Sequence, residues 1–453
     1  MSRDAKIITV GSGMGSLCTA AALAKETGRR PTVFEREERI GGSFSTYRID
    51  SFSVDTGAHL LTRGRTGELP QLLRRYVSHD VFERHFSPQE SYNFTLRGRT
   101  SRLPRNLIEL LNFKILSTRE RRQTIHMLLR FLSMGREGTK QVSSLTSYDL
   151  VEPEIAGEDM YFWLNAITWM CSGSDIHHAP ASRIVDTFVR NRRLSPSYVI
   201  RHVSPTGRAS EEDYYPIGGA ASVPRLLIDS AGLDVRTRRE VNRICVTDGI
   251  VEGIEADGKF YPAEIVVYGG LLKDLPTLLG RKNLPREDLK KYSSLKEYYG
   301  LSLWIGFDKG IESFSRQSIV KIEESTDPPK WVVFTSDFDP GVAPKGKLLV
   351  VSTILTSKPR SRQIDQIEAA VEEALPHHKR HIITRHEQVC LAEKCLQDKE
   401  KNVWTLPKQK TGIQGLYVVG TDTAGWGNGG NLCADSALRC LEFIKQDFPE
   451  LFT

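Results

Sequence analysis

The stretch that decides the fold is KIITVGSGMGSLCTAAALAKETGRRPTVFE, residues 6–35. Residues 6–10 are mostly apolar and β-branched and end at a glycine, which predicts a short buried strand. A helix follows up to Gly28, and residues 31–34 predict a second strand. Together they form a β-turn-α-β unit of the size found in parallel α/β folds. The apolar face of the helix consists of Leu17, Ala20, Ala21 and Ala24.

The turn between the first strand and the helix is rich in glycine. Gly11 permits a tight turn, and Gly13 removes a side chain where a pyrophosphate must approach the backbone. The helix N-terminus adds free N–H groups and a partial positive charge. Ser16 stands in place of the third glycine of the usual G-x-G-x-x-G pattern, and a glycine lies one position earlier. We therefore predict a dinucleotide-binding turn formed by Gly11, Gly13, Met14 and Gly15.

An acidic residue follows the second predicted strand at the expected distance. Glu35 lies 22 positions after Gly13. A carboxylate there can accept hydrogen bonds from both ribose hydroxyls of an adenosine, and it would repel the 2′-phosphate of NADP. Glu35 and its neighbour Arg36 are therefore predicted to bind the cofactor.

A Gly-Gly pair at 41–42 follows the acid and brings a second loop towards the cofactor. Here the sequence resembles the glutathione-reductase-like flavoproteins, in particular the branch that holds phytoene desaturases, carotenoid isomerases, amine oxidases and protoporphyrinogen oxidase. The resemblance implies bound FAD, with Gly42 and Ser43 beside it. Desaturases usually have a basic residue where this chain has Ser43, so the chain departs from the pattern at one diphosphate contact.

Three further stretches resemble the same branch. They are FSVDTGAH at 52–59, YPIGG at 215–219 with Val241 further on, and GLYVVGTD at 415–422, which leads into GWGNGG at 425–430. The resemblance places His59 near the flavin and the Val241 backbone at the adenine. The last stretch would reach the pyrophosphate and pass under the flavin ring. It supplies the predicted contacts Gly420, Asp422, Gly430 and Asn431, where Asp422 would accept bonds from a ribityl hydroxyl or from loop N–H groups and so organise the turn.

The order of these stretches implies two discontinuous domains in an α/β fold. A Rossmann-like FAD-binding domain of the glutathione-reductase type would comprise residues 1–65, 211–279 and 405–453. A second, α+β substrate domain would comprise residues 66–210 and 280–404. A length of 453 residues also exceeds what one hydrophobic core usually supports.

Shorter patterns predict individual elements. Residues 240–246 should pair with 250–255 across Asp248-Gly249, and Asp257-Gly258 should turn the chain into a strand at 260–268. Strands are also predicted at 301–307, 331–334 and 348–352, and a helix at 363–375.

Two helical patterns leave alternatives open. Ser117 to Glu120 resembles a capping box, and the helix after it has several arginines and an apolar face of Ile125, Leu128, Leu129 and Leu132. Such a helix docks on a core or lies on a membrane surface. The aromatic run at 161–170 either belongs to the core or lines a tunnel for an apolar substrate.

Bulk composition narrows the class of protein. Apolar residues make up 39% of the chain and charged residues 26%, and the net charge of +6 is too diffuse for nucleic-acid binding. Seven scattered cysteines without a CxxC pair fit a reducing compartment.

Neither a signal peptide nor an apolar run long enough for a membrane span is recognisable, so we expect a cytoplasmic protein. His177-His178 and His377-His378 lack partners at a metal-site spacing, and we predict no metal.

The expected chemistry is hydride transfer from a substrate C–H bond to the flavin. The resemblance implies a hydrophobic isoprenoid or polyene-like substrate, with oxygen, a quinone or another carrier as electron acceptor. His59 and Trp426 are the candidate catalytic residues. One alternative is an amine oxidase, which usually has two aromatic residues flanking the flavin; Trp426 could be one of them, and the second is not identified. Further alternatives are a protoporphyrinogen oxidase, a redox-neutral isomerase, and a non-redox prenyl-binding protein of the Rab GDP-dissociation inhibitor type.

Overall fold

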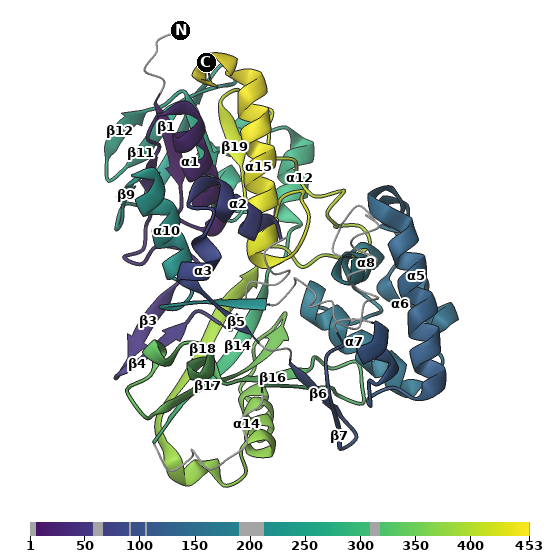
Figure 1. Cartoon of the computed structure of the whole chain (residues 1–453). Coiled ribbons are helices and arrows are strands. Elements are labelled where there is room, and N and C mark those ends of the chain that lie inside the picture. The colour runs from purple at the N-terminus through teal and green to yellow at the C-terminus, as the bar shows by residue number, and fades with distance from the viewer. Residues whose placement is uncertain are drawn as a thin grey trace.

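The computed structural model describes residues 6–57, 67–89, 92–104, 107–189, 213–308 and 318–452. It contains two large sheets, one in the upper part of the molecule and one in the lower part, with a group of helices beside them (Figure 1). The fold is mixed α/β with a parallel sheet.

The upper sheet is parallel and has five strands. Its central strand β1 (Ile7–Val10) lies between β13 (Ile265–Tyr268) and β2 (Thr32–Phe34). The outer strands are β19 (Leu416–Val418) beside β13 and β9 (Asp234–Arg236) beside β2. The first strand, helix and second strand predicted from residues 6–35 are thus confirmed. Segments from the beginning, middle and end of the chain meet in this one sheet.

Side chains alternate between the two faces of this sheet. Ile7 and Val33 face a helical layer, whereas Ile8 and Val266 face an antiparallel layer. The helical layer is formed by α1 (Met14–Thr27), α2 (Glu68–Tyr76), α10 (Ser222–Ala231) and α15 (Gly429–Asp447). The antiparallel layer contains β10 (Val241–Thr247), β11 (Ile250–Ala256) and β12 (Lys259–Pro262), followed along the chain by α11 (Leu275–Leu279) and α12 (Arg286–Ser293).

The hairpin predicted across Asp248-Gly249 is confirmed by the pairing of β10 with β11. The single strand predicted at 260–268 is wrong, because β12 ends at Pro262 and β13 belongs to the parallel sheet. Proline has no N–H to donate to the ladder, so the antiparallel pairing stops there and the chain crosses to the other layer.

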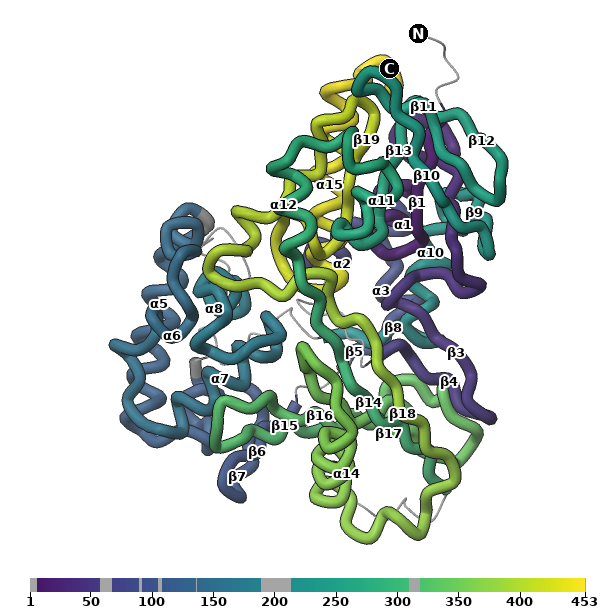
Figure 2. Tube along the Cα trace, turned by 180° about the vertical axis from the view of Figure 1, so that it is seen from behind, coloured from purple at the N-terminus to yellow at the C-terminus, as the bar shows by residue number. Residues whose placement is uncertain are grey.

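The lower sheet has seven strands in the order β18-β14-β17-β16-β15-β6-β7, and all neighbours are antiparallel except β15 and β6. Figure 2 shows β14 and β18 side by side, running from the parallel sheet into this one. The predicted strands at 301–307, 331–334 and 348–352 correspond to β14, β16 and β17. The bounds are β6 (Asn93–Leu96), β7 (Arg99–Arg102), β14 (Tyr298–Phe307), β15 (Ile319–Lys321), β16 (Lys330–Val333), β17 (Leu348–Thr356) and β18 (Ile382–Glu393).

Helices cover the two faces of the lower sheet. The predicted helix at 363–375 is α14 (Arg362–Ala374), and it packs on one face through Ile364 and Ile367. A helical group packs on the opposite face, where Trp163 and Phe131 join the sheet residues Trp304 and Val333 in one core. This group comprises α4 (Leu107–Leu111), α5 (Thr118–Gln141), α6 (Ser147–Val151), α7 (Glu158–Ser172) and α8 (Ala181–Val189).

The remaining elements connect the two sheets. They are the hairpin of β3 (Thr46–Ile49) and β4 (Phe52–Asp55), the pair β5 (Phe86–Gln89) and β8 (Asp213–Pro216), and the short helices α3 (Val81–His85) and α13 (Thr335–Phe338). The predicted division into five segments of two domains stays a prediction, and the boundaries at 65/66 and 210/211 lie outside the described residues.

Helix α5 begins with the predicted capping box, because the Ser117 hydroxyl accepts a bond from the Glu120 N–H and the Glu120 carboxylate accepts one from the Ser117 N–H. Its predicted apolar face is partly wrong. Met127 and Phe131 are fully buried, whereas Leu129 is 54% exposed. Ile125, Leu128 and Leu132 of the predicted face pack against the core as expected, so the helix docks on the core and only Leu129 departs from the prediction. No helix in the described part of the chain combines the length and apolarity needed to cross a membrane.

Candidate functional site

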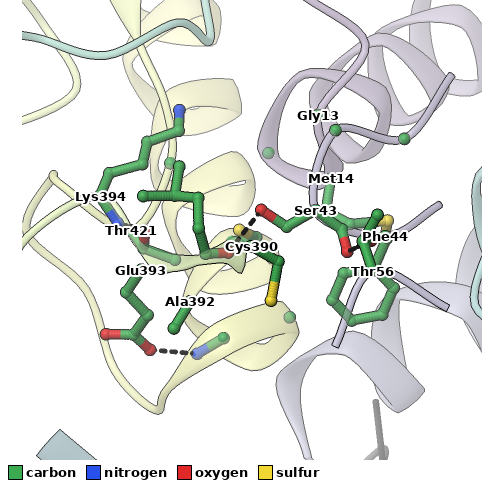
Figure 3. Close-up of a pocket in the computed structure, with 18 of the residues that line it drawn as sticks. Gly13, Met14, Ser43, Phe44, Thr56, Cys390, Ala392, Glu393, Lys394 and Thr421 are labelled. Atoms are coloured by element: carbon green, nitrogen blue, oxygen red, sulfur yellow. Dashed lines mark hydrogen bonds between the residues drawn. The ribbon is translucent and has the colours of Figure 1, made fainter. Parts of the chain in front are cut away.

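A cavity of about 860 Å³ extends from the carboxyl ends of the parallel strands to the near ends of β14 and β18 (Figure 3). In open α/β sheets this end of the strands is the usual place for a ligand. One part of the cavity is lined by glycine-rich turns and the other by apolar side chains from the lower sheet and α7. We call these parts the nucleotide half and the apolar half.

The first turn has the backbone that its predicted role requires. Gly11 has a φ of +88°, which favours glycine. A Cβ on Gly15 would lie 3.1 Å from the Gly420 nitrogen, closer than most Cβ contacts, so α1 packs tightly against the end of β19 and a glycine fits best there. A Cβ on Gly13 would meet no atom within 4 Å, and Gly13 caps α1 without a side-chain bond. The N-terminus of α1 therefore opens into the nucleotide half.

Glu35 lies at the end of β2 and lines the same half. One carboxylate oxygen accepts bonds from the Ser12 N–H at 2.8 Å and the Ser12 hydroxyl at 2.6 Å. The other accepts a bond from the Glu37 N–H at 2.8 Å. Glu35 thus holds the first turn in place as well as facing the cavity, a structural role that the sequence did not indicate. Arg36 lies on the exposed rim, 3.4 Å from Glu37.

The second glycine loop lies against the first turn. Gly41 and Gly42 have φ values of +97° and +58°, and Gly41 forms a bridge with Gly13. The Ser43 hydroxyl donates a bond of 2.9 Å to the Leu391 carbonyl at the end of β18. The predicted contact residues Gly42 and Ser43 both line the cavity, and Ser43 ties this loop to the lower sheet (Figure 3).

Asp55 joins two of the stretches that resemble the family, residues 52–59 and residues 215–219. Its carboxylate accepts bonds from the Tyr215 hydroxyl at 2.7 Å, the Ala220 N–H at 2.8 Å and the Thr46 hydroxyl at 2.6 Å. Burial and the Asp55 carboxylate raise the pKa of Tyr215 well above its ordinary value. The Tyr215 hydroxyl therefore keeps its proton, and its bond to Asp55 stabilises the fold. Gly57, further along the first stretch, lines the cavity. His59 lies outside the described residues.

The C-terminal stretch contributes Gly420, Gly430 and Asn431 to the cavity as expected, but Thr421 takes the place of Asp422. Thr421 lines the cavity, whereas Asp422 is 1% exposed and lies behind the lining, where it accepts a bond from the Leu272 N–H at 2.8 Å. Burial raises the pKa of Asp422, and the Lys394 ammonium 3.9 Å away opposes that shift. Asp422 therefore organises a turn, and its predicted contact with the cofactor has no support in this geometry.

Trp426 is also displaced from its predicted place. Its ring packs edge-on against Trp404 with 4.9 Å between the ring centroids, and it is not among the described lining residues. The expectation that Trp426 flanks the flavin therefore has no geometric support. Helix α15 begins at Gly429, so Asn431 lies in its first turn.

Most of the other predicted contacts are brought together. The predicted cofactor residues that line the cavity are Gly11, Gly13, Met14, Gly15, Glu35, Arg36, Gly42, Ser43, Val241, Gly420, Gly430 and Asn431.

Sequence reasoning missed a buried ion pair beside the glycine-rich loop. Arg183 of α8 and Glu393 of β18 form a 2.7 Å pair, and their side chains are 2% and 3% exposed. Glu393 also accepts a bond from the Gly429 N–H at 2.5 Å, and Arg183 donates to the Gly427 carbonyl. Burial would lower the pKa of Arg183, but the facing Glu393 raises it, so the guanidinium stays charged. The pair fixes the loop that precedes α15.

Tyr298 extends this cluster into the cavity. Burial and the neighbouring Glu393 raise the pKa of Tyr298 well above its ordinary value, so its hydroxyl keeps its proton at neutral pH. No local pattern could have found the cluster, since Arg183 and Glu393 are 210 positions apart. The predicted strands did not include β18, an edge strand with many half-exposed polar side chains.

The apolar half is lined by side chains from several elements. Helix α7 is divided between the two roles left open by its sequence: Trp163 is buried in the core, whereas Ile167 and Met170 line the cavity. The Cys390 side chain points into the space opposite Ser43 and Thr56 (Figure 3), and burial raises its pKa to about 11, so it remains a thiol. Further lining residues of this half are Tyr92, Leu103, Cys171, Thr187, Trp331, Thr353 and Leu355.

The histidine pairs have ordinary partners. His177 contacts the Tyr161 hydroxyl and His178 the Asp175 carboxylate, while the fully buried His378 contacts the Leu375 carbonyl. Within the described ranges, no cluster of three or more His, Cys, Asp or Glu side chains could hold a metal ion.

Comparison with known proteins identifies the family of this chain. The model of the family described as flavin containing amine oxidoreductase matches residues 17–440. The chain belongs to this family. The family resemblance inferred from the sequence is thereby confirmed, and the chain is a flavin-dependent oxidoreductase by family.

Two relatives match over most of their length at low identity. The 4,4′-diaponeurosporene oxygenase of Staphylococcus haemolyticus is 21% identical over 92% of each chain. The 1-hydroxycarotenoid 3,4-desaturase of Flavobacterium is 23% identical over 75% of this chain and 74% of that protein. A local match of 36% identity to the rat all-trans-retinol 13,14-reductase covers 15% of this chain and only 11% of that protein.

A crystal structure of an oxidoreductase from Methanosarcina mazei has the same fold. Its TM-score is 0.74 at 18% identity, and the alignment covers 96% of this chain and all of that one. At this identity the likeness concerns the fold alone.

Proposed function

We propose that this protein binds FAD and transfers a hydride to it from a hydrophobic isoprenoid or polyene-like substrate, as a phytoene desaturase-like enzyme. The observation that carries the proposal is the single cavity in which a glycine-lined nucleotide half continues into an apolar half. The two long matches to carotenoid-modifying enzymes support the substrate class.

The nucleotide half fits an FAD molecule. Gly11, Gly13 and Gly15 leave backbone and a helix N-terminus facing the space where a diphosphate would lie. Glu35 would accept the ribose hydroxyls, and Val241 would meet the adenine. A parallel sheet faced by a three-stranded antiparallel sheet supports a Rossmann-like FAD-binding domain of the glutathione-reductase type.

Bound FAD would supply the hydride acceptor, and the residues of this chain would prepare the site around it. Ile167, Met170 and Trp331 would exclude water and hold an apolar chain against the ring. The Arg183–Glu393 pair would fix the loop under the flavin. A neutral Cys390 thiol would leave the apolar half uncharged at that point. His59 stays a candidate catalytic residue.

The amine oxidase alternative has less support. Amine oxidases usually flank the flavin with two aromatic residues, and Trp426, the residue suggested for one of these places, packs against Trp404 and is not among the described lining residues. The electron acceptor remains open between oxygen, a quinone and another carrier.

The proposal can be tested on the purified protein. It should be yellow, and acid precipitation should release FAD into the supernatant, because neither the first glycine turn (11–16) nor the loop at 41–44 contains a Cys or His that could form a covalent link to the flavin. Anaerobic mixing with a panel of polyenes, isoprenols and amines should bleach the flavin with the apolar compounds. A colourless protein that does not take up added FAD would overturn the proposal, as would bleaching by amines alone.

A further inference from the structure

The second glycine loop lacks the positive charge that the desaturases usually have there. Ser43 occupies that position, and its hydroxyl is bonded to the Leu391 carbonyl. A diphosphate carries negative charge, and a helix N-terminus supplies only about half an elementary positive charge. Another cation is therefore expected near Gly13 and Gly15.

Lys394 lies three positions after Leu391 and lines the same cavity. Figure 3 shows that Glu393 and Lys394 extend to opposite sides of the strand end. The Lys394 ammonium donates to the carbonyls of Gly269 at 2.5 Å and Gly270 at 2.8 Å, directly after β13. A Cβ on Gly420 would lie 2.7 Å from that ammonium. The charge therefore sits beside the strand ends that surround the N-terminus of α1.

The other two cations among the described lining residues are unsuited to this role. The side chains of Arg36 and Arg239 are 68% and 53% exposed and pair with Glu37 and Asp257. They lie on the rim near Glu35 and Val241, where the adenosine is expected. The Lys394 side chain is 18% exposed. It is thus the most buried cation of the described lining.

The contacts of Lys394 leave it able to bind an anion. An ammonium group has three donors, and two of them are used by neutral carbonyls. Asp422 lies 3.9 Å away and forms an ion pair with this ammonium, but it is beyond hydrogen-bond distance and takes none of the three donors. One donor therefore remains for an oxygen of a ligand in the nucleotide half.

We propose that Lys394 is the diphosphate-binding cation of this chain, in place of the basic residue that the desaturases have at position 43. The inference rests on the proposed binding of FAD. It places the positive charge on Lys394, at the end of β18, because the second glycine loop has Ser43 where the desaturases have a basic residue. The Ser43–Leu391 bond keeps the loop and the strand end together.

The test measures FAD affinity of the apoprotein by flavin-fluorescence titration. Lys394→Met should weaken binding at least about tenfold, since it removes a charge-assisted hydrogen bond to the diphosphate, and it should reduce the dependence of affinity on salt. Lys394→Arg should retain most of the affinity. Adding Ser43→Arg to Lys394→Met should restore binding, because it returns the charge at the family position. Lys401→Met, on a lysine outside the described lining, should have no effect.

The outcomes separate this inference from the proposed function. Failure of the wild-type protein to bind FAD would overturn both. Wild-type binding that Lys394→Met leaves unchanged would overturn the role of Lys394 alone. A second pattern would also overturn the role of Lys394. In it, Lys394→Met lowers FAD affinity and apoprotein stability together, and Ser43→Arg does not restore binding although the single Ser43→Arg variant binds FAD normally. Lys394 would then support the Gly269–Gly270 backbone instead.

Discussion

The two halves of the cavity are built in different ways. The nucleotide half is lined mainly by backbone from short glycine-rich turns at the ends of parallel strands, and each turn is one continuous stretch of sequence. The apolar half is lined by single side chains from elements far apart in the chain, such as Ile167 on α7 and Trp331 on β16. Backbone sites depend on the absence of side chains, whereas side-chain sites depend on tertiary packing. Substitutions should therefore affect the two halves differently.

The largest effect on stability is expected where the two halves meet, at the buried ion pair. Glu393→Ala would leave the Arg183 guanidinium buried and unpaired, which should lower the free energy of unfolding by about 3–5 kcal/mol. Denaturant unfolding of the apoprotein measures this loss of stability. Glu387→Ala on the same strand is the control, because Glu387 is 50% exposed and its ion pair is worth little. Equal stability of the two variants would show that the pair does not hold the glycine-rich loop.

A side chain added to the nucleotide half should block the ligand without harming the fold. Gly13→Val places its side chain in open space, and Gly13 has a backbone conformation that any residue adopts, with φ of −65° and ψ of 163°. We expect FAD affinity to fall at least about a hundredfold, equivalent to about 2.7 kcal/mol, with unchanged apoprotein stability.

Gly412→Val is the matched control, since a Cβ there also meets no atom within 4 Å but Gly412 does not line the cavity. Normal FAD binding by Gly13→Val would mean that the N-terminus of α1 does not face the cofactor.

Glu35→Ala should affect both binding and folding, because the carboxylate holds Ser12 and Glu37 as well as facing the cavity. FAD affinity should fall about tenfold, and the apoprotein should lose roughly 1–3 kcal/mol through the unpaired Ser12 N–H. Glu35→Gln should be milder, since its amide oxygen still accepts. Titration and thermal unfolding measure the two effects, with Glu38→Ala on an exposed carboxylate as control. A Glu35→Ala variant with full FAD affinity would contradict the ribose assignment.

The smallest effect is expected from trimming the apolar half. Met170→Ala should raise the KM for an apolar substrate by a few fold, because each buried methylene contributes about 0.8 kcal/mol and the flexible ligand recovers part of that contact. FAD affinity should not change. Met134→Ala on α5 is the matched control, since Met134 packs on the core away from the described lining. The division into halves would be wrong if Met170→Ala reduced FAD affinity and left KM unchanged.

The same contrast explains what the sequence could predict. Gly13, Glu35 and the hairpin at Asp248-Gly249 follow from local rules of turn chemistry and strand pattern, and the structure has them where they were expected. Thr421 was missed in favour of Asp422 because a long-range bond to the Leu272 N–H turns Asp422 away from the cavity. Which of these two neighbouring residues faces the cavity depends on a hydrogen-bond partner 150 positions away. No local sequence pattern contains that information.

The apolar half shows this limit more strongly. The face of α5 was misassigned in part, because hydrophobic periodicity alone did not distinguish Leu129, which is exposed, from Met127 and Phe131, which belong to the same buried core as residues of the sheet. Lys394 and Glu393 were missed because β18 is a polar edge strand without the apolar alternation that marks a buried one. The candidate site was thus predictable where backbone forms it, and unpredictable where separate elements bring side chains together.

The most direct test of the central claim is a single-turnover experiment with the yellow holoprotein in the absence of oxygen. An isoprenoid with saturated bonds, labelled with deuterium at the carbons that would lose hydride, is mixed with oxidised enzyme, and flavin absorbance and product are followed together. The account predicts that the flavin bleaches with formation of one new double bond per flavin, and more slowly for the deuterated substrate. Flavin that stays oxidised with every apolar compound but is reduced stoichiometrically by an amine would contradict it.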